Sequence, residues 1–337
     1  MANGQTTMNI TKPLFAALLL SSGVAFSAAA VAQAAAPTAA ESAPAAAEPP
    51  PPAPSLGTEY TEKGADTCLM CHTEAWPYPI FPIFKTKHAV RTDARTPFAG
   101  RQCEACHGPG AKHAGSGDKN AINSFKPTSF LLPEERNKFC LECHRGNART
   151  GWHASTHASN NLACTNCHKI HAERDPVRAT ATQPEVCYNC HKKQRADFTK
   201  PSVHPVRVGK MACSECHNPH GSTTTAMLVK PSVNQTCFTC HAEKRGPFLW
   251  EHAPAAEDCT LCHTPHGSVY GSLLKKNAPL LCQQCHTVSG HPAVARTGAA
   301  LPGGSAGGSG FLLAGGCTNC HSQVHGSNHP SGVKLMR

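Results

Sequence analysis

The feature that most constrains this 337-residue chain is a five-residue motif, Cys-x-x-Cys-His, which occurs ten times and uses all twenty cysteines. The motif cysteines are Cys68 and Cys71, Cys103 and Cys106, Cys140 and Cys143, Cys164 and Cys167, Cys187 and Cys190, Cys213 and Cys216, Cys237 and Cys240, Cys259 and Cys262, Cys282 and Cys285, and Cys317 and Cys320. The closing histidines are His72, His107, His144, His168, His191, His217, His241, His263, His286 and His321. Cys-x-x-Cys-His is the attachment signal of a c-type haem, so the sequence predicts ten covalently attached haems c.

The spacing within the motif suits haem attachment better than it suits the alternatives. Two thiols add across the haem vinyl groups and the adjacent histidine binds the iron, and residues three and four apart lie on one face of a helical turn. A zinc ribbon has no need of a histidine directly after every cysteine pair. A disulfide framework or a thioredoxin-like redox pair does not account for ten copies of one strict spacing with no cysteine left over.

Twelve further histidines lie outside the motifs, and most of them recur in register. From Cys103 onward a histidine precedes one motif, a second histidine follows that motif shortly, and another motif closes the unit. A haem with two axial ligands is closed to substrate, so this set decides between an electron carrier and an enzyme. The repeat provides ten histidines, which we predict to be the second ligands of ten bis-histidine irons: His88, His113, His157, His171, His204, His220, His252, His266, His291 and His325.

The remaining histidines are His153 and His329, each four residues from a predicted ligand. The choice between His157 and His153, and between His325 and His329, is open at this point. Histidine at both axial positions predicts low reduction potentials, because methionine ligation raises them.

Two of the predicted second ligands follow a motif too closely to serve the same haem. His220 and His266 lie three residues after His217 and His263. Three residues span at most about 10 Å, which is too short to pass around a porphyrin to its opposite face. We therefore expect both histidines to bind a neighbouring haem.

The N-terminal residues have the pattern of an export signal followed by a tether. Lys12 precedes an apolar run, and small residues then continue to Ala32-Gln33-Ala34, an A-x-A cleavage pattern. We predict a signal peptide over residues 1–34 and an Ala/Pro-rich linker over residues 35–60. Haem is attached to such motifs outside the cytoplasm, so the signal and the motifs agree on a periplasmic protein.

The spacing of the motifs predicts a repetitive architecture with few apolar side chains. First cysteines are 22–26 residues apart between Cys140 and Cys282, and 35–37 apart towards the ends. Aromatic residues make up 6% of the chain, so porphyrins must supply much of the core. We predict a multihaem cytochrome c fold, mostly coil with short α-helices and little or no β-structure, in an elongated haem-stacked array. Five motifs lie in residues 61–191 and five in residues 192–337, which suggests two pentahaem halves.

The formal net charge of +10 does not indicate a nucleic-acid partner. Each haem adds two propionates, and a ferric iron with two neutral imidazoles leaves one positive charge on the porphyrin. Ten haems therefore remove about ten positive charges, which leaves the oxidised protein near neutral. Lysines and arginines are better suited to pair with propionates than with phosphates.

Three stretches carry a resemblance to a known family. They are residues 63–72 (KGADTCLMCH), 242–254 (AEKRGPFLWEHAP) and 320–330 (CHSQVHGSNHP). With the ten motifs between them, the chain resembles the MtrA/DmsE family of decahaem periplasmic cytochromes over roughly residues 64–332.

The resemblance implies an elongated chain of bis-histidine haems that is inserted in an outer-membrane β-barrel porin. Expected partners are periplasmic or inner-membrane cytochromes on one side and an extracellular multihaem cytochrome or reductase on the other, in metal reduction or Fe(II) oxidation. A barrel explains how such a chain crosses lipid, since only helices and closed barrels satisfy their backbone groups there. The alternatives are a multihaem oxyanion reductase, which needs an open iron, and a free periplasmic electron shuttle.

Overall fold

The computed structural model describes residues 55–287, 317–334 and 336–337. All of these fall in one compact unit, Ala53–Arg337. The predicted signal peptide, most of the predicted linker and the predicted ligand His291 lie outside the described residues.

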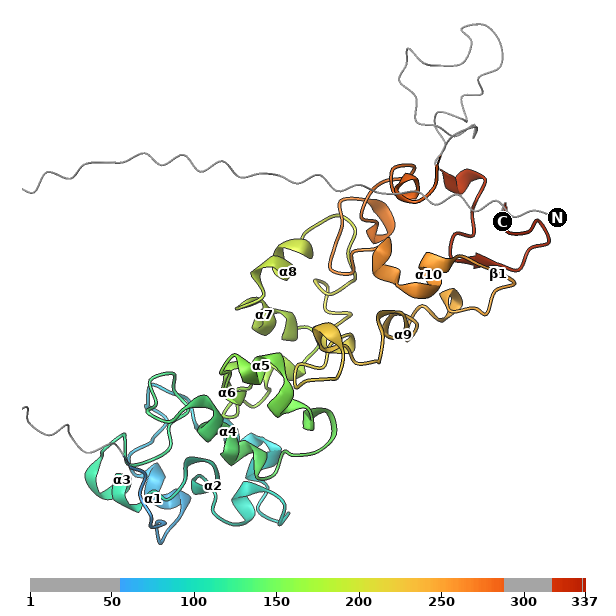
Figure 1. The fold of residues 1–337 in the computed structure, drawn as a ribbon. Helices are drawn as coiled ribbons and strands as arrows, with labels where there is room; N and C mark the ends of the chain where they lie inside the picture. Colours follow the sequence, from blue (N-terminus) through green and yellow to red (C-terminus); the bar gives the residue numbers. More distant parts are fainter. Residues whose placement is uncertain (1–54, 288–316, 335) are drawn as a thin grey trace, which may run out of the picture. The chain divides into compact units, whose positions relative to one another are not determined.

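The described part of the chain folds into short helices joined by coil (Figure 1). The longest α-helix has nine residues, and within the described residues no helix has the length and apolarity to cross a membrane. The α-helices are α1 (Ala65–Leu69), α2 (Glu104–His107), α3 (Ala111–Ser116), α4 (Pro133–Leu141), α5 (Thr156–Ser159), α6 (Cys164–Cys167), α7 (Gln183–Tyr188), α8 (Lys192–Asp197), α9 (Val233–Cys237) and α10 (Ala253–Glu257).

Short 3₁₀ helices lie between these α-helices, and two short strands form one sheet. The 3₁₀ turns are η1 (Phe81–Lys85), η2 (Lys87–Ala89), η3 (Pro97–Ala99), η4 (Asn147–Arg149), η5 (Trp152–Ala154), η6 (Pro176–Arg178), η7 (Cys213–Glu215), η8 (Thr225–Met227), η9 (Ala242–Lys244), η10 (Cys259–Leu261), η11 (Gly271–Leu273), η12 (Cys282–Gln284) and η14 (Cys317–Asn319). Strand β1 (Trp250–Glu251) pairs antiparallel with β2 (Gly326–Ser327). The predicted class, mostly coil with short helices and little β-structure, is confirmed.

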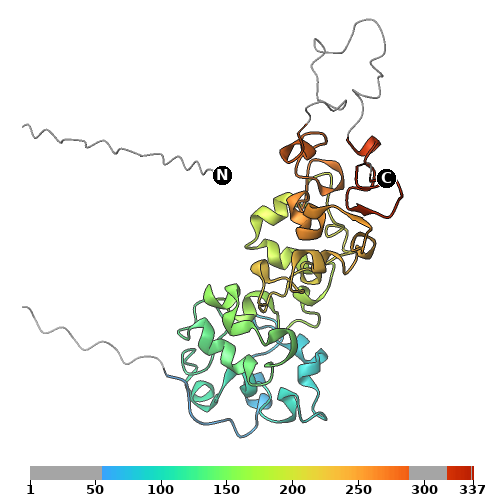
Figure 2. The same ribbon diagram turned by 45° about the vertical axis from the view of Figure 1, so that its right-hand side comes forward.

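The elements pack partly in chain order and partly through contacts between distant segments. In Figures 1 and 2 the sequence colours run from the blue and cyan segments at α1–α3 to the orange and red segments at α10 and β1. Several packed elements are close in sequence, as with α2 and α4, α7 and α8, or α9 and η10. Other contacts join distant segments, as between Lys85 and Glu173 and between β1 and β2.

Apolar packing is sparse. The hydrophobic cluster of the described residues consists of Tyr188, Phe198 and Val206, with Val203 and Met211 packed against it. A unit of this size would ordinarily bury a much larger apolar core. Little within the polypeptide can replace that core, so the stability of the fold depends on the groups attached to the motifs.

Buried amides hold consecutive motifs together. Asn137 Oδ1 accepts a hydrogen bond from the Cys164 N–H at 2.8 Å, and Asn234 Oδ1 accepts one from the Cys259 N–H at 2.7 Å. Each asparagine is buried and lies three residues before the first cysteine of the preceding motif. A buried amide that satisfies a main-chain donor is costly to lose, so these two residues fix one motif against the next.

A glycine follows three of the predicted second ligands, His220, His266 and His325. The φ angles of these glycines are 106°, 151° and 142°, a region that side chains rarely adopt. Each glycine is buried at a point of close chain approach. The atoms that a Cβ would overlap belong to Gly151 at Gly221, to Asp197 at Gly267, and to Phe248 at Gly326.

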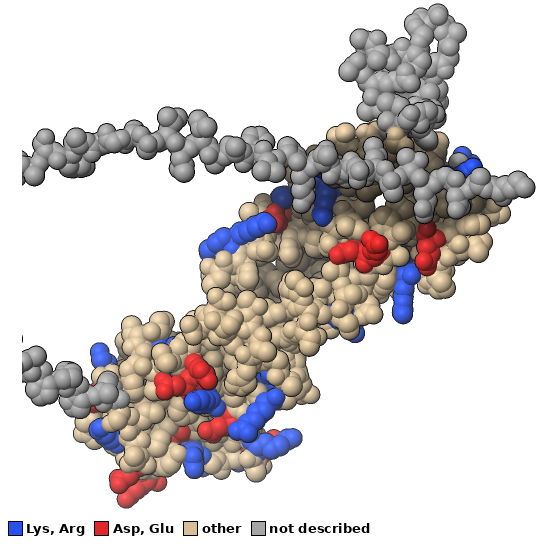
Figure 3. Space-filling view, viewed as in Figure 1, with Lys and Arg blue, Asp and Glu red and all other residues tan. Residues whose placement is uncertain are grey.

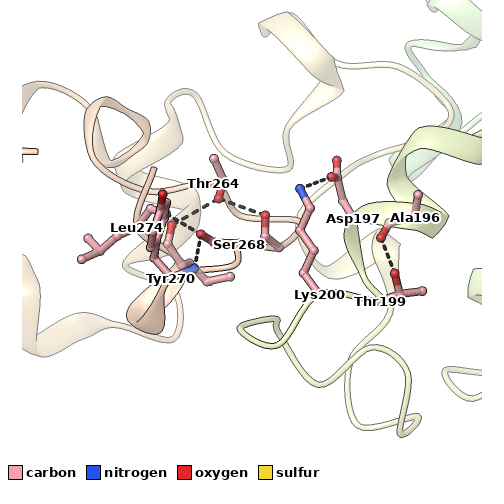
Figure 4. Close-up of polar contacts among 10 residues, drawn as sticks. Ala196, Asp197, Thr199, Lys200, Thr264, Ser268, Tyr270 and Leu274 are labelled. Atoms are coloured by element: carbon pink, nitrogen blue, oxygen red, sulfur yellow. Dashed lines mark hydrogen bonds and ion pairs between the residues drawn. The ribbon is translucent and has the colours of Figure 1, made fainter. Parts of the chain in front are cut away.

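Figure 4 shows the two segments that meet near Gly267, the first from Ala196 to Lys200 and the second from Thr264 to Leu274. The Ser202 N–H donates to the Ser268 carbonyl at 3.1 Å, and the Ser268 N–H donates back to Ser202 at 2.9 Å. Lys200 Nζ lies 2.5 Å from Asp197 Oδ1 on the first segment. The two segments are thus joined through main-chain atoms, which leaves no room for a side chain at the glycine.

Charged side chains are spread over the surface. On the face drawn in Figure 3, lysines and arginines are interspersed with aspartates and glutamates and separated by uncharged surface. This face presents no single basic field of the kind that binds a polyanion.

Gly267→Ala should destabilise the holoprotein by about 1–3 kcal/mol, because the new Cβ would overlap the Asp197 carbonyl oxygen. The matched control is Gly271→Ala, since a Cβ at Gly271 meets nothing within 4 Å and should change stability by less than about 0.5 kcal/mol. Guanidinium unfolding followed by far-ultraviolet circular dichroism measures both. Equal midpoints for the two variants would contradict the close approach at Gly267.

Candidate functional site

Each motif forms one helical turn with the same hydrogen bonds. In all ten motifs the histidine N–H donates to the carbonyl of the first cysteine at 2.9–3.0 Å. This i to i+4 bond brings the two thiols and the imidazole of a motif onto one side of the turn. The local sequence alone therefore assembles the attachment half of each site.

First cysteines of consecutive motifs meet in alternate pairs. Thiol–thiol hydrogen bonds join Cys68 to Cys103, Cys140 to Cys164, Cys187 to Cys213, Cys237 to Cys259, and Cys282 to Cys317. In the first of these pairs the hydrogen bond raises the pKa of Cys68 and lowers that of Cys103.

Second cysteines approach one another across the intervening junctions. Burial raises the pKa of Cys106, and Cys143 of the next motif adds a smaller effect. The same pattern links Cys167 to Cys190, Cys216 to Cys240 and Cys262 to Cys285. Attachment points of consecutive motifs are thus adjacent from the first motif to the tenth.

Nine motif histidines face a histidine from outside the motifs. The two ring centres are 6.0–6.3 Å apart in every pair. The pairs are His72–His113, His107–His171, His144–His88, His168–His220, His191–His157, His217–His266, His241–His204, His263–His325 and His286–His252.

This separation fits a metal ion between the rings. A metal–imidazole nitrogen bond is about 2 Å, and two such bonds plus the distance from each nitrogen to its ring centre give about 6 Å. Beside each pair lie the two thiols of the motif. The residues present therefore fit haem c, held by two thioethers and by a histidine on each side of the iron.

Burial favours the neutral imidazole that metal binding requires. It lowers the pKa of His107 on the motif side of a pair and of His220 and His266 on the other side. For His171, burial lowers the pKa to about 4. These rings are uncharged at neutral pH and keep a nitrogen lone pair for a metal.

The pairing follows a rule that the sequence repeat did not indicate. A histidine that follows an even-numbered motif faces the motif two places earlier, so His220 faces His168 and His266 faces His217. The exception is His113, which follows the second motif and faces His72 of the first. A histidine that precedes an even-numbered motif faces the motif after it, as His157 faces His191. Such a scheme joins successive units through their imidazoles.

The two histidines left outside the sequence repeat have other surroundings. His153 is exposed, and no ring contact joins it to a motif histidine within the described ranges. The main chain of His329 accepts a hydrogen bond from the Trp250 indole N–H at 3.1 Å, and its Nδ1 accepts one from the Ser331 N–H at 3.1 Å. The ring of His325, in contrast, lies against His263.

Hydrogen bonds at Nδ1 fix the orientation of several rings. On the motif side, His107, His217 and His263 each contact a main-chain carbonyl oxygen, at 2.7–2.8 Å. On the other side, His157 contacts the carbonyl of Pro219 and His204 that of Pro265. Such bonds leave Nε2 free to bind iron.

Sequence reasoning missed the residues that hold the sites in place. Asn137 and Asn234 carry a usable signal, since each lies three residues before a motif. Asp175, whose carboxylate contacts His168, has no counterpart in the other motifs that would have singled it out.

Comparison with protein families matches several parts of the chain. Residues 204–246 and 252–291 match the family described as doubled CXXCH motif. Residues 103–183 match the cytochrome c-type protein NrfB-like family, and residues 31–108 match cytochrome c554 and c-prime. These matches support covalent haem c on the chain.

A curated relative covers most of the sequence. The chain is 50% identical over 278 residues to the multiheme cytochrome MtrA of Shewanella baltica (strain OS185). The matched region is 82% of this chain and 83% of that protein.

Proposed function

Because the chain belongs to the MtrA family of multihaem electron-transfer cytochromes, we propose that it is a decahaem conduit that passes electrons across the outer membrane. Haem c, when bound, supplies a one-electron iron couple. The polypeptide attaches ten such groups through the twenty cysteines and ten motif histidines, and closes each iron with a second histidine. Two pentahaem halves, residues 61–191 and 192–337, divide the conduit.

The observation that carries the proposal is the set of nine facing histidine pairs. An iron between two imidazoles has no position left for a substrate, so the chain does no chemistry beyond accepting and donating electrons. The tenth pair in the proposal is His321 with His291. The adjacent thiols of consecutive motifs support short gaps between neighbouring haems, which electron tunnelling requires.

The predicted export signal and the family support a cellular location for the conduit. We propose that it lies in the periplasm, inside or docked to an outer-membrane β-barrel porin, because a closed barrel satisfies its backbone groups in lipid. Periplasmic or inner-membrane cytochromes exchange electrons with one end, and an extracellular multihaem cytochrome or reductase with the other. The interspersed charges of Figure 3 support protein partners over nucleic acid.

Low-temperature electron paramagnetic resonance should resolve two classes of low-spin ferric haem. Ring planes are 7–29° apart in five pairs but 83° apart in His88–His144 and 73° apart in His157–His191. Near-parallel imidazoles give rhombic signals, and near-perpendicular ones give a signal with a larger maximum g value. A spectrum without the second class, or with a high-spin component in the intact protein, would argue against these ligands and favour the reductase alternative.

His266→Ala should open one iron, because His266 faces His217 at 6.0 Å. All ten haems remain attached, and about a tenth of the ferric absorbance changes from low-spin to high-spin. His153→Ala is the control and should leave the spectrum unchanged. Mass spectrometry counts the haems in both variants. A fully low-spin His266→Ala protein would exclude this histidine as a ligand.

Isolation of detergent-solubilised outer membranes tests the conduit itself. The cytochrome should co-purify with a large barrel protein, and the complex placed in vesicles should reduce an enclosed acceptor from an external donor. Recovery only as a free monomer from cells that make the barrel would favour the periplasmic shuttle instead.

A further inference from the structure

The contact between His168 and Asp175 differs from the other contacts made by motif histidines. His168 Nδ1 lies 2.6 Å from Asp175 Oδ2. The side chain of Asp175 is only 14% exposed and that of His168 is 28% exposed. With Nε2 assigned to iron, Nδ1 carries the proton and donates a hydrogen bond to the carboxylate.

The other motif histidines from His72 to His286 have no such partner. Where their Nδ1 atoms make a hydrogen bond, the acceptor is a neutral main-chain carbonyl, as at His217 and His263. Glu243 Oε1 lies 3.8 Å from His241 Nδ1, beyond hydrogen-bond distance, and its side chain is 61% exposed. Over this range a close, shielded carboxylate therefore acts on His168 alone.

The protein holds the Asp175 carboxylate in position from two sides. Its second oxygen, Oδ1, accepts a hydrogen bond from the Lys169 N–H at 3.1 Å. Asp175 also immediately precedes the 3₁₀ turn η6, which begins at Pro176. A carboxylate fixed in this way keeps its charge directed at the imidazole.

We propose that Asp175 is a positioning residue that lowers the reduction potential of the fourth haem, the one attached at Cys164 and Cys167. The inference rests on the proposed bis-histidine ligation, in which His220 faces His168 at 6.0 Å with ring planes 7° apart. A carboxylate on Nδ1 makes the imidazole a stronger donor and adds negative charge. Both effects stabilise ferric iron over ferrous iron, since the ferric centre carries one more positive charge.

The consequence for the conduit is a lowered reduction potential at one position along it. With Asp175 in place, the fourth haem accepts an electron less readily than it would without the carboxylate, whichever way electrons flow. Electrons held by the chain are therefore found at this position less often than they would be in a chain without that carboxylate.

Asp175→Asn tests the proposal, because asparagine keeps a hydrogen-bond acceptor and removes the charge. Spectropotentiometric titration of the purified holoprotein, taken as the difference between variant and parent, should show one haem in ten shifted upwards. We expect at least a tenfold change in its reduction equilibrium, about 59 mV for one electron. Electron paramagnetic resonance of the oxidised variant should remain entirely low-spin, which shows that the ligands are intact.

Glu243→Gln is the matched control, since it removes a carboxylate near a motif histidine that makes no hydrogen bond to it. Its titration should superimpose on that of the parent. Asp175→Glu retains the charge and should stay closer to the parent than Asp175→Asn. If Asp175→Asn fails to load ten haems, Asp175→Glu serves as the test. A low-spin Asp175→Glu protein in which the reduction equilibrium of one haem changes tenfold would then overturn the proposal.

The outcomes separate this inference from the proposed function. An Asp175→Asn titration identical to that of the parent, with all irons low-spin, overturns the role of Asp175 and leaves the conduit standing. A high-spin haem in the parent protein overturns the bis-histidine proposal, and the inference with it.

Discussion

The facing of two imidazole rings across a gap of about 6 Å is the constraint on which the rest of the structure depends. Each described pair joins residues that are 34–64 positions apart in the chain. Closing loops of that length costs entropy, which a sparse apolar core cannot offset by itself. In the proposed bis-histidine arrangement, the free energy that closes them would come largely from the bonds between both rings and a shared metal, which would make cofactor binding and folding one process.

Polar and main-chain contacts fix the positions of the motifs that the ring pairs bring together. Asn137 and Asn234 fix one motif against the next through a single buried hydrogen bond each. Glycines such as Gly267 allow one unit to lie directly on the backbone of another. These devices need little apolar area, which explains how a chain with few aromatic residues keeps a defined arrangement of sites.

Much of the fold and half of every site could be predicted from local sequence. The motif turn depends on five consecutive residues, so its hydrogen bond from histidine to first cysteine recurs at all ten positions. The same locality predicted coil with short helices. The partner of each ring was beyond this reasoning, because His220 is three residues from His217 but faces His168. The contact of Asp175 with His168 was also missed, since a lone aspartate in a loop has no distinguishing pattern.

The sequence by itself determined the number of Cys-x-x-Cys-His motifs, the identity of the motif histidines and the supply of further histidines in register with them. These features follow from covalent chemistry and from the geometry of a single turn, which act over a few residues. Only the tertiary structure decided which rings face each other, at what angle, and which histidine meets a carboxylate in place of a carbonyl. Those properties depend on how distant segments pack, and the energies that position them come from contacts between units that no local pattern encodes.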